Sequence, residues 1–280
     1  MKILSIRIKN FENIEYYSTI FKEKNLLSYD PGSKSIVKAI GIVLKNPALY
    51  GNIEDLVFSE KTQINATIQV EKAIYRIFVR VMNNKFVYLV GRTGIGEIEE
   101  DKFYDLISNC PEEEQLSYFE YDTGQELPEK FGKYMDYDYF YSREEFQKQT
   151  DGMGVTNTFS KCLREHIKDY EKEKIPGKEK KEIVINKDGN FVVQNKDGKE
   201  IKEKNLQDKE KNMLKLVSFI SLNEFWEKME KIRNIHYVEP PVVIINPEQN
   251  SAKTNKDFIT KKVDQLNRQV FMFSKEKKKS

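Results

Sequence analysis

Residues 25–40 of the chain read Asn-Leu-Leu-Ser-Tyr-Asp-Pro-Gly-Ser-Lys-Ser-Ile-Val-Lys-Ala-Ile. The apolar start of this stretch predicts a short buried strand at residues 25–29, and the Pro-Gly pair after it predicts a turn. Ile36, Val37 and Ile40 then have the spacing of one face of a helix. The stretch therefore predicts a strand, a tight turn and a helix in immediate succession.

This layout is typical of a phosphate-binding loop, in which backbone N–H groups and a helix N-terminus face an anion. The sequence motif of such loops is G-x-x-x-x-G-K-[ST]. Lys34 and Ser35 match its last two positions, but Ser33 replaces the preceding Gly and Ser28 replaces the first Gly. We therefore predict an eroded nucleotide site at Gly32, Ser33, Lys34 and Ser35. An equally weighted alternative is that the segment forms only a turn and a helix cap.

Composition limits the class of protein without naming a ligand. The chain has 280 residues, of which 33% are charged, and its formal net charge is only +2, so composition alone does not indicate a nucleic-acid binder. Cys110 and Cys162 do not form a disulfide framework of the secreted type. The N-terminus lacks an apolar signal core, and no window approaches a membrane-spanning run of about 20 residues. We therefore expect a soluble cytoplasmic protein that does not contact a membrane.

The first hundred residues predict a β-rich region. Residues 2–9 alternate polar and apolar side chains, residues 14–21 form a second strand after a turn, and residues 63–90 form an antiparallel meander. The Gly-rich segment 91–96 precedes acidic residues, which would repel phosphate. We interpret it as a flexible connection.

The rest of the chain predicts one irregular region followed by mixed elements. Residues 101–149 are aromatic and acidic; Tyr118, Phe119 and their neighbours could stack nucleobases, but packing in a helical insertion or contact with a protein partner is the preferred interpretation. The expected elements after it are a hairpin at 182–193, a helix or helix pair at 206–230, a strand at 242–245 buried on both faces, a helix at 257–266 and a strand at 269–273.

Four segments in this order resemble the ABC-type ATPase heads of the RecF/SMC group and the related OLD-like ATPases of DNA repair and phage defence. They are the opening strand 1–11, the loop already described, Leu206-Gln207-Asp208-Lys209-Glu210 (similar to the signature L-S-x-G-E), and the strand 242–245 with Asn246-Pro247-Glu248 after it (similar to a Walker B segment). Residues 269–275 resemble the last strand of such heads. The resemblance covers about the first 45 and the last 95 residues.

The sequence departs from the family pattern at each of these motifs. In the signature-like segment, Gln207 replaces Ser and Lys209 replaces Gly, while Glu210 is kept. Asn246 replaces the metal-facing Asp, the catalytic Glu is either lost or shifted to Glu248, and Lys275 replaces the switch His. Phosphoryl transfer needs positioning, metal and a water-orienting group at once, so these changes together would impair hydrolysis strongly.

The resemblance implies an α/β P-loop NTPase fold with a mixed central sheet, an antiparallel β lobe and a helical insertion. We expect a single head-like domain at 1–275, with an N-terminal lobe at 1–100, the insertion at 101–180, a C-terminal lobe at 181–275 and a basic tail at 276–280.

The preferred hypothesis is a catalytically silent head that serves as a binding or regulatory subunit. It would pair with an active head or with itself, and DNA stays open as a further partner. One alternative is a functional ATPase that binds ATP and Mg²⁺, with Lys34 as phosphate ligand, Ser35 as metal ligand and Glu248 as general base. Another is a nucleic-acid-binding protein that uses the basic runs 178–181 and 275–279 without nucleotide chemistry.

The remaining candidate residues favour structural roles. His166 and His236 lie far apart without neighbouring metal-ligand spacing, so no metal cluster is expected. Trp226 is expected in the core.

Overall fold

The computed structural model describes residues 1–108, 118–120, 181–185, 191–201, 236–246 and 263–274, with isolated positions between 205 and 234. The chain divides into two compact units. The first comprises residues 1–120, 237–249 and 268–280, and the second comprises residues 121–236 and 250–267.

The first unit contains a six-stranded antiparallel sheet of order β2-β1-β4-β5-β6-β7. Its strands are β1 (Lys2–Phe11), β2 (Ile14–Ile20), β4 (Phe58–Val70), β5 (Ala73–Met82), β6 (Lys85–Arg92) and β7 (Gly96–Ile98). One face of each long strand is buried; on β1, for example, Ile6 and Ile8 are buried and Arg7 between them is exposed. This arrangement confirms the antiparallel lobe predicted from the period-two pattern.

The Gly-rich segment 91–96 is a β-hairpin and not a flexible connection. Gly91 and Arg92 end β6, Gly96 begins β7, and Arg92 pairs with Gly96 across the turn. Gly94 and Gly96 have φ angles of +83° and +99°. Because other residues avoid these backbone angles, the glycines allow the tight reversal.

The first unit also contains a four-stranded parallel sheet of order β3-β13-β12-β8. Its strands are β3 (Lys24–Ser28), β8 (Tyr118–Glu120), β12 (Val242–Asn246) and β13 (Val270–Ser274). β12 lies inside the sheet, and residues 242–245 are at most 1% exposed, which confirms the predicted strand buried on both faces. The described strands are all parallel, whereas the sequence predicted a mixed sheet.

The position of Tyr118 and Phe119 differs from the predicted helical insertion. They lie in β8 and pair with Val243 and Ile244 of β12, so they belong to the parallel sheet and not to a helical insertion. A strand of three residues is too short to show periodicity in a sequence, and the acidic residues around it concealed it.

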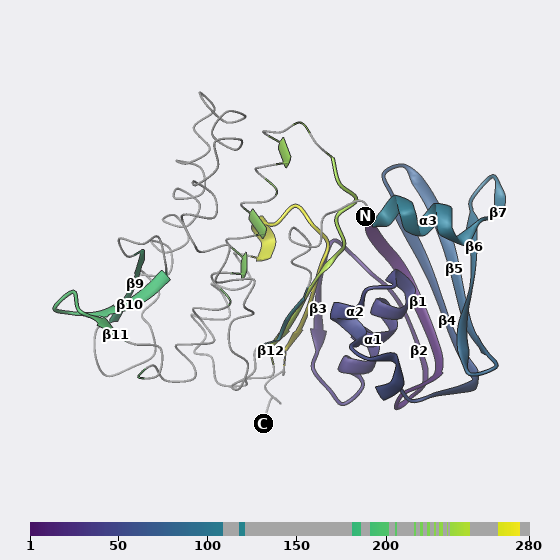
Figure 1. The fold of residues 1–280 in the computed structure, drawn as a ribbon, viewed down its shortest axis with the longest axis horizontal. Helices are drawn as coiled ribbons and strands as arrows, with labels where there is room; N and C mark the ends of the chain where they lie inside the picture. The colour runs from purple at the N-terminus through teal and green to yellow at the C-terminus, as the bar shows by residue number, and fades with distance from the viewer. Residues whose placement is uncertain are drawn as a thin grey trace. The chain divides into compact units, whose positions relative to one another are not determined.

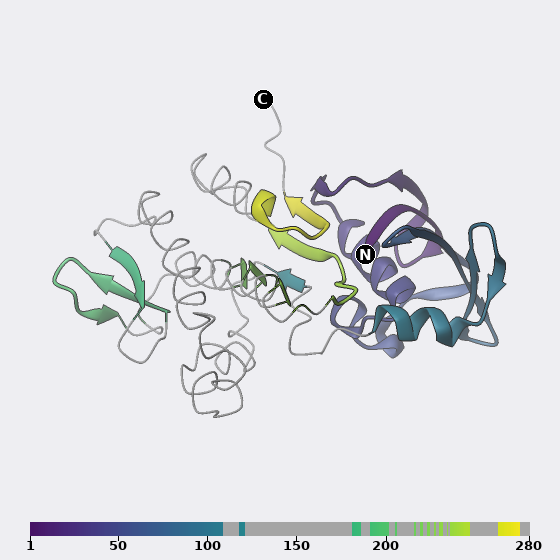
Figure 2. The same cartoon turned by 90° about the horizontal axis from the view of Figure 1, so that it is seen from above.

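Helix α1 (Ser33–Leu44) lies between the two sheets (Figures 1 and 2) and contributes to one core with both of them. Its residues Ile36, Val37, Ile40, Ile42 and Val43 are all buried, as expected for a helix covered on more than one side. The helix follows β3 as predicted and ends with Lys45 in the left-handed conformation. The short helix α2 (Pro47–Tyr50), the 3-10 turn η1 (Ile53–Asp55) and helix α3 (Glu100–Ile107) complete this part.

Gln269 joins the two sheets through its buried side chain. Its carbonyl oxygen accepts the N–H of Ile3 at 2.7 Å, and its amide donates to the carbonyl oxygens of Ile3 and Lys22 at 2.8 and 2.9 Å. Since the residue is only 3% exposed, these bonds replace water and fix β1 against the start of β13.

The described part of the second unit contains the predicted hairpin. β9 (Lys181–Ile185) and β10 (Phe191–Asn195) pair antiparallel, and β11 (Glu200–Ile201) adds a third strand. The described positions between 216 and 231 are helical, as predicted. None of the helices in the described part of the chain has both the length and the apolar character that a membrane crossing requires.

Candidate nucleotide site

The carboxyl edge of the parallel sheet gathers the segments that the sequence singled out. Ser28 at the end of β3 is in register with Ser274 of β13, which is in register with Asn246 of β12. The phosphate-loop segment and the Walker-B-like strand are therefore separated by one strand, or about 10 Å between Ser28 and Asn246. Glu120, at the end of β8, lies at the same edge beside Ile245.

The loop between β3 and α1 is closed by hydrogen bonds within itself. The Ser33 hydroxyl accepts the N–H of Asp30 at 2.8 Å and lies 3.0 Å from the carbonyl oxygen of Ser28, to which it donates. The Asp30 carboxylate accepts the N–H of Gly32 at 2.8 Å, and the N–H of Ser33 donates to the Asp30 carbonyl at 3.0 Å. The N–H groups of Asp30, Gly32 and Ser33 are therefore bonded within the loop itself.

Asn13 holds the loop from outside. It lies in the turn between β1 and β2, donates to the carbonyl oxygen of Pro31 at 2.8 Å and accepts the hydroxyl of Ser35 at 2.6 Å. Lys38, one turn further along α1 than Lys34, forms an ion pair with Glu12 at 2.9 Å. The turn at residues 12–13 thus fixes both the loop and the first turns of α1.

Lys34 extends towards the neighbouring strand end and forms an ion pair with Glu120 at 2.7 Å. Glu120 is largely buried, with 13% of its side chain exposed, while Lys34 is 52% exposed. The cationic end of Lys34 thus contacts a carboxylate of the protein.

ATP with Mg²⁺ is the ligand that the resemblance of the sequence implies for this loop. A phosphate-binding loop offers free N–H groups to the anion, but here the N–H groups of Asp30, Gly32 and Ser33 already donate to protein oxygens. The carboxylate of Asp30 also places negative charge at the loop. Burial raises the pKa of the nearby Tyr17, and the charge of Asp30 adds to this rise. In this arrangement these three N–H groups are bonded to oxygens of the protein and are not free for a phosphate.

Several predicted site residues lie outside the described residues. These are Gln207, Lys209, Glu210, Glu248 and Lys275, together with His166, Cys110, Cys162 and Trp226. His236 is described and exposed. Within the described part of the chain, no group of His, Cys, Asp or Glu side chains could hold a metal ion.

The structure adds three residues to the site that sequence reasoning missed. Asp30 lies inside the quoted stretch. An Asp in a turn often accepts the N–H two residues further on with its own side chain, so its bond to Gly32 could have been predicted from the sequence. Asn13 and Glu120 are distant in sequence, and only the pairing of strands brings them to the loop. A single sequence contains no direct signal for such contacts.

Comparison with solved structures places the fold. The chain is similar to an SMC head bound to the C-terminal winged-helix domain of ScpA, with a TM-score of 0.60 and 12% identity over 99% of this chain and 90% of that one. It is also similar to the recombination mediator RecF with ATPrS, with a TM-score of 0.50 and 12% identity over 99% of this chain and 93% of RecF. No family model matches the chain. No curated protein matches it either.

The chain has the SMC/RecF-like ABC-ATPase head fold, as predicted. Its architecture agrees with this assignment, since an antiparallel sheet and a parallel sheet enclose the helix that follows the loop.

Proposed function

We propose that this chain is a catalytically silent or strongly impaired ABC-ATPase-like head. It acts as a binding or regulatory subunit in an assembly of the DNA-repair, chromosome-maintenance or phage-defence type. The similarity to SMC and RecF heads supports the class of assembly.

One observation carries the proposal: the loop donors and Lys34 are engaged by the protein itself. To bind a triphosphate, the loop would have to break the bonds of Ser33 and Asp30 and release Lys34 from Glu120. Each such exchange opposes binding, because every hydrogen bond broken within the protein must be replaced by a bond to the phosphates. The departures of the signature-like and Walker-B-like segments point in the same direction.

The first experiment measures ATP binding with Mg²⁺ and steady-state hydrolysis for the purified chain. The proposal expects no turnover above background and weak binding that Lys34→Ala does not change. Lys38→Ala is the matched control, because it removes a paired lysine of the same helix one turn away. Hydrolysis that disappears in Lys34→Ala and persists in Lys38→Ala would establish the alternative, a functional ATPase with Lys34, Ser35 and Glu248 in the roles described above.

A restoring variant tests the physical cause. Asp30→Gly with Ser33→Gly removes the carboxylate and the hydroxyl that close the loop, and Glu120→Gln weakens the hold on Lys34. If these contacts block the site, we expect the triple variant to bind ATP at least about tenfold more tightly than the wild type. An unchanged affinity in a folded triple variant would show that the loop contacts are not the cause.

The partner that we propose is a protein, either an active head or a second copy of this chain. The similar SMC head was solved with a protein bound, which supports this choice. Sedimentation of the chain at increasing concentration, with and without ATP and Mg²⁺, tests the self-association. A monomer under all conditions would exclude the second copy and leave the active head.

A further inference from the structure

The six-stranded sheet has a second face, on the side opposite to α1. Residues two apart on a strand share a face, so the cross-strand pairs of β2, β1, β4 and β5 define rows on this side. We call the following residues the outer face: Ile20, Ser5, Thr67 and Arg76 in the first row; Ser18, Arg7, Asn65 and Phe78 in the second; Tyr16, Lys9, Gln63 and Arg80 in the third.

The outer face has an excess of cations. It contains Arg7, Lys9, Arg76 and Arg80, and the one carboxylate on its rows is Glu97 of β7, which continues the Arg76 row beyond Gly91. None of these four side chains forms an ion pair within the described part of the chain. By contrast, Lys2, Lys34, Lys38 and Lys45 each pair with a glutamate. Unpaired cations on one face attract an anionic ligand.

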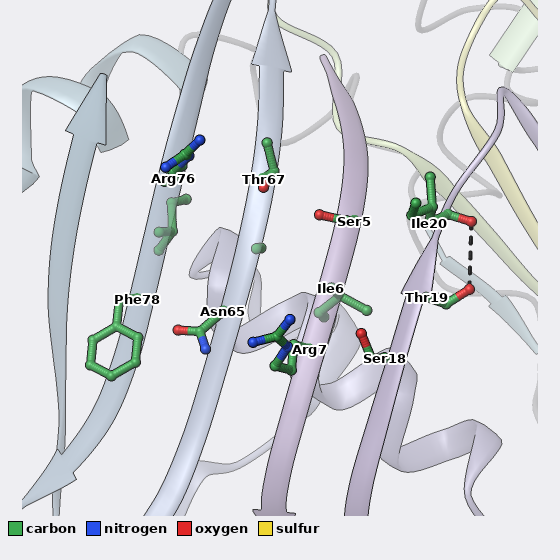
Figure 3. Close-up of a pocket in the computed structure, with 12 residues that line it drawn as sticks. Ser5, Ile6, Arg7, Ser18, Thr19, Ile20, Asn65, Thr67, Arg76 and Phe78 are labelled. Atoms are coloured by element: carbon green, nitrogen blue, oxygen red, sulfur yellow. Dashed lines mark hydrogen bonds between the residues drawn. The ribbon is translucent and has the colours of Figure 1, made fainter. Parts of the chain in front are cut away.

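The outer face is also hollowed. A groove of about 630 Å³ is lined by Arg7 and Arg76, by Asn65 and Thr67 on the strand between them, and by Phe78. Figure 3 shows these side chains projecting from β1, β4 and β5 towards the same side of the sheet. The two arginines lie two strands and one row apart, a backbone separation of roughly 12 Å. Hydroxyl and amide groups between them can complete the binding of an anion.

Two aromatic side chains are interleaved with the cations. Phe78 is opposite Asn65 and only partly buried, and Tyr16 is opposite Lys9 and 58% exposed. Neither ring stacks on another ring within the described residues. An aromatic face beside cations is the combination that binds unpaired nucleobases together with their phosphates.

We propose that the outer face binds single-stranded nucleic acid, with Arg7 and Arg76 at phosphates and a base stacked on Phe78. An acidic peptide would bind to the cations alone and would not need the accessible aromatic ring of Phe78. A duplex would hide its base faces from Phe78. The proposed site uses none of the residues of the phosphate loop, and it goes beyond the function proposed above.

The test is fluorescence anisotropy of the full chain with a labelled oligothymidylate of about 20 nucleotides, titrated from about 50 to 200 mM salt. The wild type should bind with a log–log salt slope that steepens by about 0.7 for each phosphate contact. Arg7→Gln with Arg76→Gln should weaken binding at least about tenfold and reduce the slope by about 1.4. Phe78→Leu keeps the apolar bulk and removes the ring, so affinity should fall about tenfold at an unchanged slope.

The control is Lys72→Gln with Lys102→Gln, which removes the same charge from exposed positions in the β4–β5 turn and in α3. It should change affinity less than about twofold, and circular dichroism should show that every variant is folded. Absence of binding at about 50 mM salt would overturn the proposal, as would an equal loss in the control. Equal displacement by polyglutamate, with Phe78→Leu unaffected, would instead identify a surface for acidic proteins and also overturn it.

Discussion

The N-terminus of α1 and the outer face of the sheet differ in whether their polar side chains have partners within the protein. At the loop, Ser33 and Asp30 are hydrogen-bonded within the loop, and Asn13 is hydrogen-bonded to it. Lys34 forms an ion pair with Glu120. On the outer face, arginine and lysine side chains have no anionic partner within the described residues. The region that resembles a ligand site by sequence therefore has several of its polar groups bonded to the protein, whereas the outer face, which has no motif, offers unpaired charge.

This difference predicts different responses to mutation. A buried group that is bonded to the protein leaves unsatisfied partners when it is removed, whereas an exposed group leaves only water. Bonded groups should therefore affect the free energy of unfolding, and outer-face groups should affect only ligand binding.

Gln269→Leu should have the largest effect on stability. It leaves the Ile3 N–H and the Ile3 carbonyl unpaired in a buried place, whereas the Lys22 carbonyl keeps the amide of Asn25 as a partner. We expect a loss of about 3 kcal/mol in the free energy of unfolding, measured by urea denaturation. Gln63→Leu on the outer face is the control and should stay within about 0.5 kcal/mol. Equal effects of the two substitutions would remove the distinction between the regions.

The sequence was sufficient for elements whose burial pattern is local. The alternation in residues 2–9 and 63–90 predicted the antiparallel lobe, and the apolar run 242–245 predicted an internal strand. In each case the solvent and core faces are determined by neighbouring residues, so a single sequence contains the information.

The sequence was insufficient where long-range pairing decides. β8 is too short for a pattern, and its place beside β12 brings Glu120 to Lys34 from a distant part of the chain. The outer face combines residues of β2, β1, β4 and β5, and each of them reads as an ordinary polar position of a half-buried strand. Only the register shows that the cations are adjacent and that the one carboxylate on their rows, Glu97, lies beyond Gly91 at the edge of the sheet.

Asn13→Ala should have the next largest effect. The substitution leaves the hydroxyl of the buried Ser35 without its partner, whereas the Pro31 carbonyl is exposed and can bond to water instead. We expect a loss of about 2 kcal/mol and faster hydrogen exchange at residues 29–36. Asn65→Ala, on the outer face, should change neither quantity measurably. If Asn13→Ala behaved like Asn65→Ala, the loop would not depend on this clamp.

A pH titration separates a buried phenol from an exposed one. Burial raises the pKa of Tyr104 above its ordinary value of about 10, and its hydroxyl donates to the carbonyl oxygen of Val43 at 2.8 Å. Its contribution to stability is therefore present below about pH 10 and is lost as the pH rises further, because the unfolded state ionises more easily. Tyr104→Phe should cost about 1 kcal/mol at pH 8 and make the alkaline loss less steep.

The control for this titration is Tyr16→Phe on the outer face. Tyr16 is 58% exposed, so removal of its hydroxyl should leave the free energy of unfolding at pH 8 within about 0.5 kcal/mol of the wild type. An alkaline slope that is the same in Tyr104→Phe and in the wild type would show that Tyr104 does not contribute to the pH dependence.

The smallest effect should come from the ion pair between Lys34 and Glu120. Although Glu120 is largely buried, Lys34 is 52% exposed, and solvent weakens the attraction between them. A double-mutant cycle with Lys34→Met and Glu120→Gln should therefore give a coupling of only about 0.5 kcal/mol. A coupling of several kcal/mol would mean that the lysine is fixed structurally. A small one means that this contact alone cannot keep a nucleotide out, so the hydrogen bonds of Ser33 and Asp30 must carry most of the closure of the loop.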